Sequence, residues 1–118
     1  MGVYQGCNVI FWRNNYPLWV GSTPDTNYHD VFERLVLAET FNFSTAINLD
    51  ITLHGIHGLA RESVAALLNA AHPDVNYPLS VAQVIQELQA SIDLGGDHIL
   101  AQLERFQAFN NLACPLIS

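Results

Sequence analysis

Lysine is absent from this chain of 118 residues, and four arginines are its only strongly basic side chains. Because the chain also carries 11 aspartates and glutamates, its formal charge at pH 7 is −7. Nucleic acids and anionic membrane surfaces attract clustered positive charge, so this composition argues against both as partners. Long apolar runs are lacking too, since none approaches the roughly 20 residues of a membrane-spanning helix. We therefore expect no membrane insertion.

Several catalytic motifs are also missing. The sequence contains no G-x-S-x-G, no P-loop, no G-x-G-x-x-G and no H-E-x-x-H. The residues that anchor hydrolase, nucleotidase, dehydrogenase and metalloprotease sites are thus not found in their usual spacing. We expect no enzymatic activity and no cofactor.

Half of the residues are hydrophobic, which is enough for a substantial core. The length fits a single domain over residues 1–118. Apolar spacing and end signals predict helices near residues 25–38, 59–72, 80–93 and 97–109. Ser80 and Gln83 form a capping box at the start of the third helix, and Asp97 is expected to cap the fourth. Asp30 and Arg34 are spaced for an ion pair on the first helix.

The first 22 residues are rich in aromatic and turn-forming residues and show no clear periodicity. Residues 9–12 fit a short extended segment without a partner strand, and residues 41–53 are ambiguous between helix and strand. We therefore expect a mainly α domain of four helices, with an irregular, aromatic-rich N-terminal segment that wraps onto the helical body.

Cys7 and Cys114 lie near opposite ends of the chain, and the sequence has no CxxC motif. A cysteine pair in this position favours one disulfide that joins the termini, a feature typical of secreted proteins. Two alternatives stay open. The cysteines could be buried thiols of a cytosolic protein. Cys7 could also be a nucleophile, although no neighbouring histidine supports that role.

Seven short fragments follow one another along the chain: Gly6-Cys7, Phe11-Trp12-Arg13-Asn14, Trp19-Val20-Gly21, Val31-Phe32, Val64-Ala65-Ala66-Leu67-Leu68-Asn69-Ala70, Tyr77-Pro78 and Cys114-Pro115-Leu116. Together they resemble a group of small prokaryotic exported domains of unassigned function. Those domains typically open with Gly-Cys-Thr-Pro-Gly-Tyr-Trp-Lys, contain His-Ala-Val-Ala-Ala-Leu-Leu-Asn-Ala and end with Cys-Pro-Leu. The resemblance implies export, a location outside the cell or on its surface, and a terminal cysteine pair. It implies no reaction.

Trp12, Tyr16 and Trp19 form a dense aromatic group near the N-terminus. One interpretation is an exposed platform that binds a partner protein or a sugar ring, because such side chains combine a large apolar area with a polar tip. The other interpretation is that they cover the helical core, which a domain of this size needs.

His54 and His57 form an H-x-x-H pair between glycines, and His29 and Glu33 are spaced one helical turn apart. These four side chains are candidate metal ligands, because a zinc site takes three or four such groups. Nothing in the sequence brings the two pairs together. The alternative is that the loop histidines form hydrogen bonds or cap the next helix.

The sequence as a whole predicts a secreted or cell-surface structural module that acts by protein–protein contact. Its partners would be copies of itself or another surface protein, since a lysine-free, hydrophobic chain has few defences against association. Two alternatives are a small metal-binding protein or metal-dependent enzyme that uses His54 and His57, and a carbohydrate-binding module that uses Trp12 and Trp19.

Overall fold

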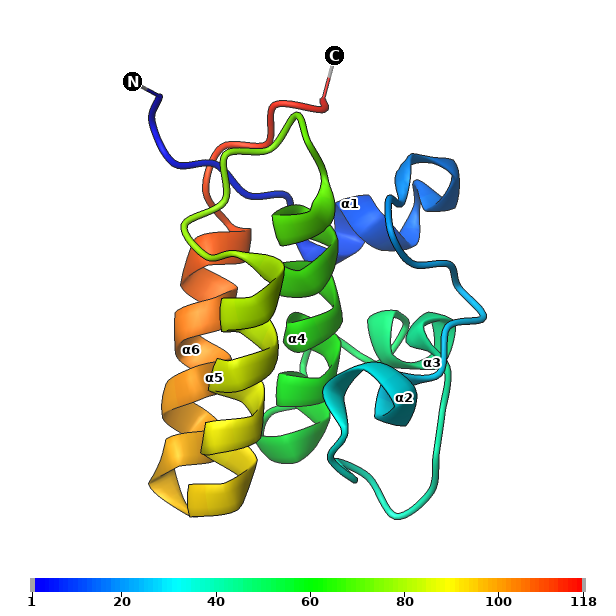
Figure 1. The fold of residues 1–118 in the computed structure, drawn as a ribbon, viewed down its shortest axis with the longest axis vertical. Coiled ribbons are helices and arrows are strands. Elements are labelled where there is room, and N and C mark those ends of the chain that lie inside the picture. The colour runs from blue at the N-terminus through cyan, green and yellow to red at the C-terminus, as the bar shows by residue number, and fades with distance from the viewer. Residues whose placement is uncertain (1, 118) are drawn as a thin grey trace.

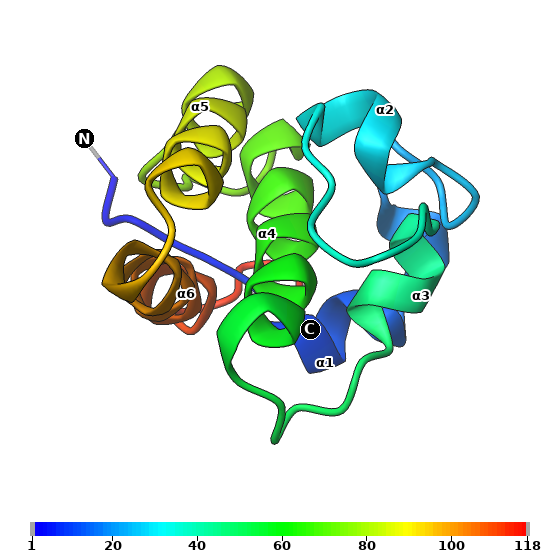
Figure 2. The same ribbon diagram turned by 90° about the horizontal axis from the view of Figure 1, so that it is seen from below.

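The computed structural model describes residues 2–117, which fold around one long helix. In chain order the helices are α1 (Val9–Arg13), α2 (Tyr28–Phe32), α3 (Phe43–Ile47), α4 (Gly55–Ala71), α5 (Val81–Leu94) and α6 (Asp97–Asn110), with a 3-10 turn at Tyr16–Leu18. α5 and α6 pack on one side of α4, and the short helices lie on the other (Figure 1). Figure 2 shows α4 between these two groups. The expected mainly α fold is confirmed.

The central helix α4 is enclosed on nearly all sides, and every residue from Gly58 to Asn69 is buried. A helix that is apolar around its whole circumference is typical of such a position. Gly58 allows the backbone of α4 to lie close to its neighbours. A Cβ there would lie 2.7 Å from the carbonyl oxygen of Leu53 and 3.0 Å from a methyl carbon of Leu103 on α6. Polar side chains in α4 must therefore find their hydrogen-bond partners inside the protein.

The ends of the later helices follow local signals in the sequence. The capping box at α5 is confirmed: the Gln83 amide donates to Ser80 Oγ (3.1 Å), and the Ser80 amide donates to Gln83 Oε1 (2.8 Å). Gly95 and Gly96 end α5 with φ values of 65° and 55°, which glycine adopts without strain. The prediction that Asp97 caps α6 was wrong, because Gly96 occupies the cap position and Asp97 is the first helical residue.

The predicted helix over residues 25–38 is much shorter in the structure, where α2 is a single short helix. Asn27 caps it by accepting a hydrogen bond from the Asp30 amide (3.1 Å), and Glu33 ends it with a left-handed φ of 55°. Arg34 then binds Asp93 of α5 through two hydrogen bonds of 2.8 Å. The predicted Asp30–Arg34 pair was therefore wrong. The Arg34 guanidinium also lowers the pKa of Asp93 below its usual value.

The N-terminal segment contains more helix than its sequence indicates. Residues 9–12 lie in α1 rather than in an extended segment, and Asn8 caps this helix by accepting from the Phe11 amide (2.9 Å). The ambiguous stretch 41–53 divides into α3 and a turn that leads to α4. No helix within residues 2–117 is long and apolar enough to cross a membrane.

The disulfide between Cys7 and Cys114 is confirmed, with the two Cα atoms 4.5 Å apart. Neither cysteine is a free thiol, so both alternatives to the disulfide were wrong. Around the bond, the Gln5 amide donates to the Asn76 carbonyl (2.8 Å) and the Gly6 amide to the Ala113 carbonyl (3.2 Å). Both end segments and the loop at residues 72–80 therefore meet at one end of α4 (Figure 1).

Candidate functional site

A set of polar side chains lies buried where α4 meets α6. Arg61 and Glu62 of α4 are only 1% and 4% exposed, and Asn69 and Asn110 are fully buried. Burying such groups is unfavourable unless hydrogen bonds replace those made with water. In this protein the four side chains form one connected network.

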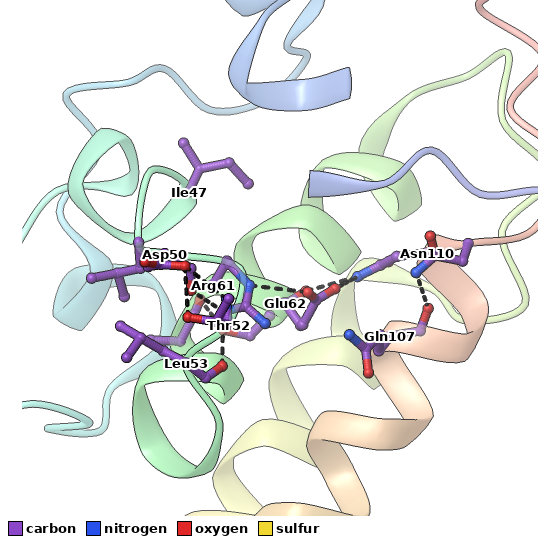
Figure 3. A network of polar contacts seen from close by, with 12 residues as sticks. Ile47, Asp50, Thr52, Leu53, Arg61, Glu62, Gln107 and Asn110 are labelled. Atoms are coloured by element: carbon purple, nitrogen blue, oxygen red, sulfur yellow. Dashed lines mark hydrogen bonds and ion pairs between the residues drawn. The ribbon is translucent and has the colours of Figure 1, made fainter. Parts of the chain in front are cut away.

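Arg61 and Glu62 occupy the centre of this network. Arg61 Nη1 donates to the carbonyl oxygens of Asp50 (2.7 Å) and Leu53 (3.0 Å), so it fixes the loop that precedes α4. Arg61 Nε donates to Glu62 Oε2 (3.1 Å), and Glu62 Oε1 accepts from Asn110 Nδ2 (3.0 Å). Figure 3 shows Glu62 between Arg61 and Asn110, with Gln107 nearby on α6.

From Asn110 the network continues to the disulfide. Asn110 Oδ1 accepts from the Tyr77 hydroxyl (2.7 Å) and from Asn69 Nδ2 (3.1 Å). Asn69 also bonds both backbone groups of Cys7: its Oδ1 accepts from the amide (2.7 Å), and its Nδ2 donates to the carbonyl (2.8 Å). Burial and the negative charge of Glu62 raise the pKa of Tyr77, which keeps its hydroxyl protonated as a donor. The disulfide is thus attached to α4 by side-chain bonds.

A pocket of about 190 Å³ opens above the Arg61–Glu62 pair. Ile10 of α1 and Ile51 of the loop before α4 line it, and both are exposed, at 42% and 52%. Gln107 of α6 also lines the pocket. Among residues 2–117, Arg61 Nη2 has no hydrogen-bond partner, although the side chain is almost completely buried. The pocket therefore holds an available donor at its base.

The remaining polar groups that line the pocket are the side-chain amides of Asn8 and Asn111. These amides lie beside the guanidinium of Arg61 and the carboxylate of Glu62, which already bond each other. Such groups are suited to binding a polar group. A nucleophilic site would need an activated hydroxyl, thiol or amine next to a base. The pocket lining thus offers hydrogen-bond donors and acceptors for a polar group.

The aromatic group lies elsewhere and is largely buried. Trp12 is 0% exposed and Trp19 is 9% exposed, and Trp19 Nε1 donates to the Trp12 carbonyl (3.0 Å). Tyr16 is half-buried, with its ring edge-on to Trp19 at 5.1 Å between centroids. The expectation of an exposed platform at Trp12 and Trp19 is thereby corrected, because these two rings lie in the core.

The candidate metal ligands are not gathered into one site. His54 directly precedes α4 and His57 lies in its first turn, and both are exposed. His29 lies on α2, and Glu33 ends that helix. Within residues 2–117, no three histidine, cysteine, aspartate or glutamate side chains are close enough to hold a metal ion. His54 forms no side-chain hydrogen bond that caps α4, so the capping role also fails.

Sequence reasoning missed Arg61, Glu62 and Asn110 as site residues. A usable signal was present in α4, whose sequence from Val64 to Ala71 is apolar except for Asn69. Such a helix must be enclosed, so the charged residues one turn before this stretch must be paired inside the protein. Their partners on α6 and in the preceding loop had no sequence signal.

The comparisons add no relative to this description. Comparison of the chain with protein-family models, curated proteins and solved structures found no match.

Proposed function

We propose that this protein is a secreted or cell-surface module that acts by protein–protein contact, and that copies of it associate with one another. The observation that carries the proposal is the pocket, which is lined by Arg61, whose Nη2 has no hydrogen-bond partner within residues 2–117, and by exposed Ile10 and Ile51. A donor that opens into a pocket is free to bond a partner, and exposed apolar side chains favour being covered. A partner that covers this face would bond the Arg61 donor and cover the two isoleucines.

The scaffold beneath this face is rigid. The disulfide fixes Cys7, and the buried network joins Cys7, α4 and α6 through side-chain hydrogen bonds. A preorganised surface loses little conformational entropy on binding. This supports a role as a binding unit.

The charges of the protein determine how copies can associate. All four arginines are engaged within the chain: Arg34, Arg61 and Arg105 pair with carboxylates, and Arg13 donates to the backbone carbonyls of Ile47 and Leu49. With a formal charge of −7, two copies repel each other at low ionic strength. Self-association must therefore depend on apolar contact, and salt should strengthen it by screening the repulsion.

The Cys7–Cys114 disulfide supports a location outside the cytosol. Disulfides persist in oxidising compartments, whereas the cytosol keeps thiols reduced. The resemblance to small exported domains points the same way.

Size-exclusion chromatography with light scattering, over a concentration series at low and high salt, tests the proposal. We expect the average mass to rise with concentration and with salt. Ile51→Ser should weaken association, because it removes an exposed apolar group at the rim of the pocket. Leu94→Ser is the matched control, since Leu94 is 66% exposed but ends α5, away from the pocket.

A monomer at every concentration would refute self-association. Association that weakens with salt would show that charges, rather than the apolar rim, bring the chains together. An equal effect of Ile51→Ser and Leu94→Ser would place the interface somewhere other than the pocket.

A further inference from the structure

The hydrogen-bonding groups at the base of the pocket define what it can accept. Arg61 Nη2 has N–H groups without a partner in residues 2–117, while Nε and Nη1 are fully used. Beside it, each oxygen of Glu62 accepts one hydrogen bond from a side chain, from Arg61 or Asn110. A carboxylate oxygen can accept more than one, so Glu62 retains accepting capacity. The base of the pocket thus offers a donor and an acceptor on adjacent side chains.

The charges at this position exclude ionic ligand groups. A carboxylate or phosphate would be attracted by Arg61 but repelled by Glu62, and an ionised carboxylate could not donate a hydrogen bond to Glu62. An ammonium group would be repelled by Arg61 and could not accept from Nη2. The group that fits is neutral, and it both accepts and donates.

The size and rim of the pocket further restrict which ligand group can bind. A volume of about 190 Å³ corresponds to roughly six water molecules at about 30 Å³ each, well below the size of a drug-like ligand site. Ile10 and Ile51 at the rim suit a short aliphatic stem. A primary amide carries its acceptor oxygen and its donor nitrogen on two neighbouring atoms, which matches the separate Nη2 and carboxylate positions.

We infer that this pocket receives the side-chain amide of an asparagine or glutamine from the protein partner, with the amide oxygen accepting from Arg61 Nη2 and the amide nitrogen donating to Glu62. This inference rests on the proposed function, because it assigns the partner group that enters the face described there. Gln107, which also lines the pocket, lies where it can contact the entering stem.

Two matched small probes test the inference without any partner protein. ¹H–¹⁵N NMR spectra of the whole chain are recorded during titration with N-acetyl-glutamine N-methylamide and, separately, with N-acetyl-glutamate N-methylamide at neutral pH. We expect saturable shifts at residues that line the pocket with the glutamine probe. The glutamate probe should bind about tenfold more weakly or not at all, which corresponds to about 1.4 kcal/mol.

Two variants locate the binding. Gln107→Trp fills the pocket from its half-buried wall and should abolish the shifts, whereas Leu94→Trp adds the same ring far from the pocket and should leave them unchanged. Arg61→Lys removes Nη2 and should also abolish them; since it alters a buried ion pair, its helical circular dichroism is compared with that of the unchanged protein.

Equal affinity for the two probes, tighter binding of the glutamate probe, or no shifts at the pocket would each overturn the inference. Shifts that survive Gln107→Trp would overturn it as well. The titration reports on the pocket of each single chain, whereas light scattering reports on association. Failure of amide recognition is thus distinguishable from failure of self-association.

Discussion

Breaking the Cys7–Cys114 bond should destabilise the protein mainly through its unfolded state. The bond closes a loop with a sequence separation of 107 residues. In the chain-entropy relation, a loop of this length removes about 16 cal/mol/K from the unfolded chain, or about 4.8 kcal/mol at 25 °C. Because small proteins are commonly stable by about 5–15 kcal/mol, reduction removes a third or more of the total.

The folded structure should survive the loss of the bond when no denaturant is present. Asn69 holds both backbone groups of Cys7, and the Gly6 amide bonds the Ala113 carbonyl beside Cys114. These contacts keep the two cysteines close together after reduction. We therefore expect the reduced protein to keep its helical circular dichroism.

Urea unfolding of the oxidised and the dithiothreitol-reduced protein measures the effect. The reduced form should unfold at a lower urea concentration and with a larger m-value, because its unfolded chain exposes more surface. A double variant, Cys7→Ala with Cys114→Ser, should agree with the reduced protein. A loss below about 1 kcal/mol would refute the loop-entropy reasoning. Loss of helical signal without urea would refute the claim that the network holds Cys7 in place.

The buried network and the buried phenols give two further predictions. Asn110→Ala removes four hydrogen bonds, including one to the Glu62 carboxylate, and urea unfolding should show a free energy of unfolding lower by about 3–5 kcal/mol. The control Asn111→Ala, at the exposed next residue, should lower it by less than about 1 kcal/mol. Similar losses for the two variants would contradict the role of the network. Burial raises the pKa of Tyr28 and Tyr77 above the value of about 10 in an unfolded chain. The stability that these two phenols contribute should therefore be constant from neutral pH to about pH 10 and should fall above it as the unfolded chain ionises. Urea midpoints on both sides of pH 10 check this, and a midpoint that does not fall would show that the phenols ionise equally in both states.

The parts of the fold that were predictable from sequence are those with local causes. The capping residues at Ser80 and Gln83 act within one turn, and Gly95 and Gly96 end α5 through their own backbone angles. In the N-terminal third, the caps at Asn8 and Asn27 begin only short helices. α2 ends at Glu33, and Arg34 bonds a residue 59 positions away, so its partner could not be identified from neighbouring residues.

The candidate site was harder to predict for a related reason. Adjacent residues on a helix do not normally face one another, so the spacing of Arg61 and Glu62 gives no indication of an ion pair. In the structure they bond each other, while Arg61 also bonds the carbonyls of the preceding loop and Asn110 reaches Glu62 from 48 positions further along the chain. The aromatic residues near the N-terminus did stand out in the sequence. Their close spacing along the chain, however, does not show whether the rings lie in the core or on the surface.

The position of the disulfide also determines how the domain responds to mechanical tension. A pull applied at residues 7 and 114 passes directly through the covalent bond, because the two Cα atoms are only 4.5 Å apart. The six helices between them carry none of that load. In its oxidised form the domain therefore does not extend when force enters at these two residues, and its pocket and buried network are protected from that force. Once the bond is reduced, the same pull is transmitted to the helices themselves.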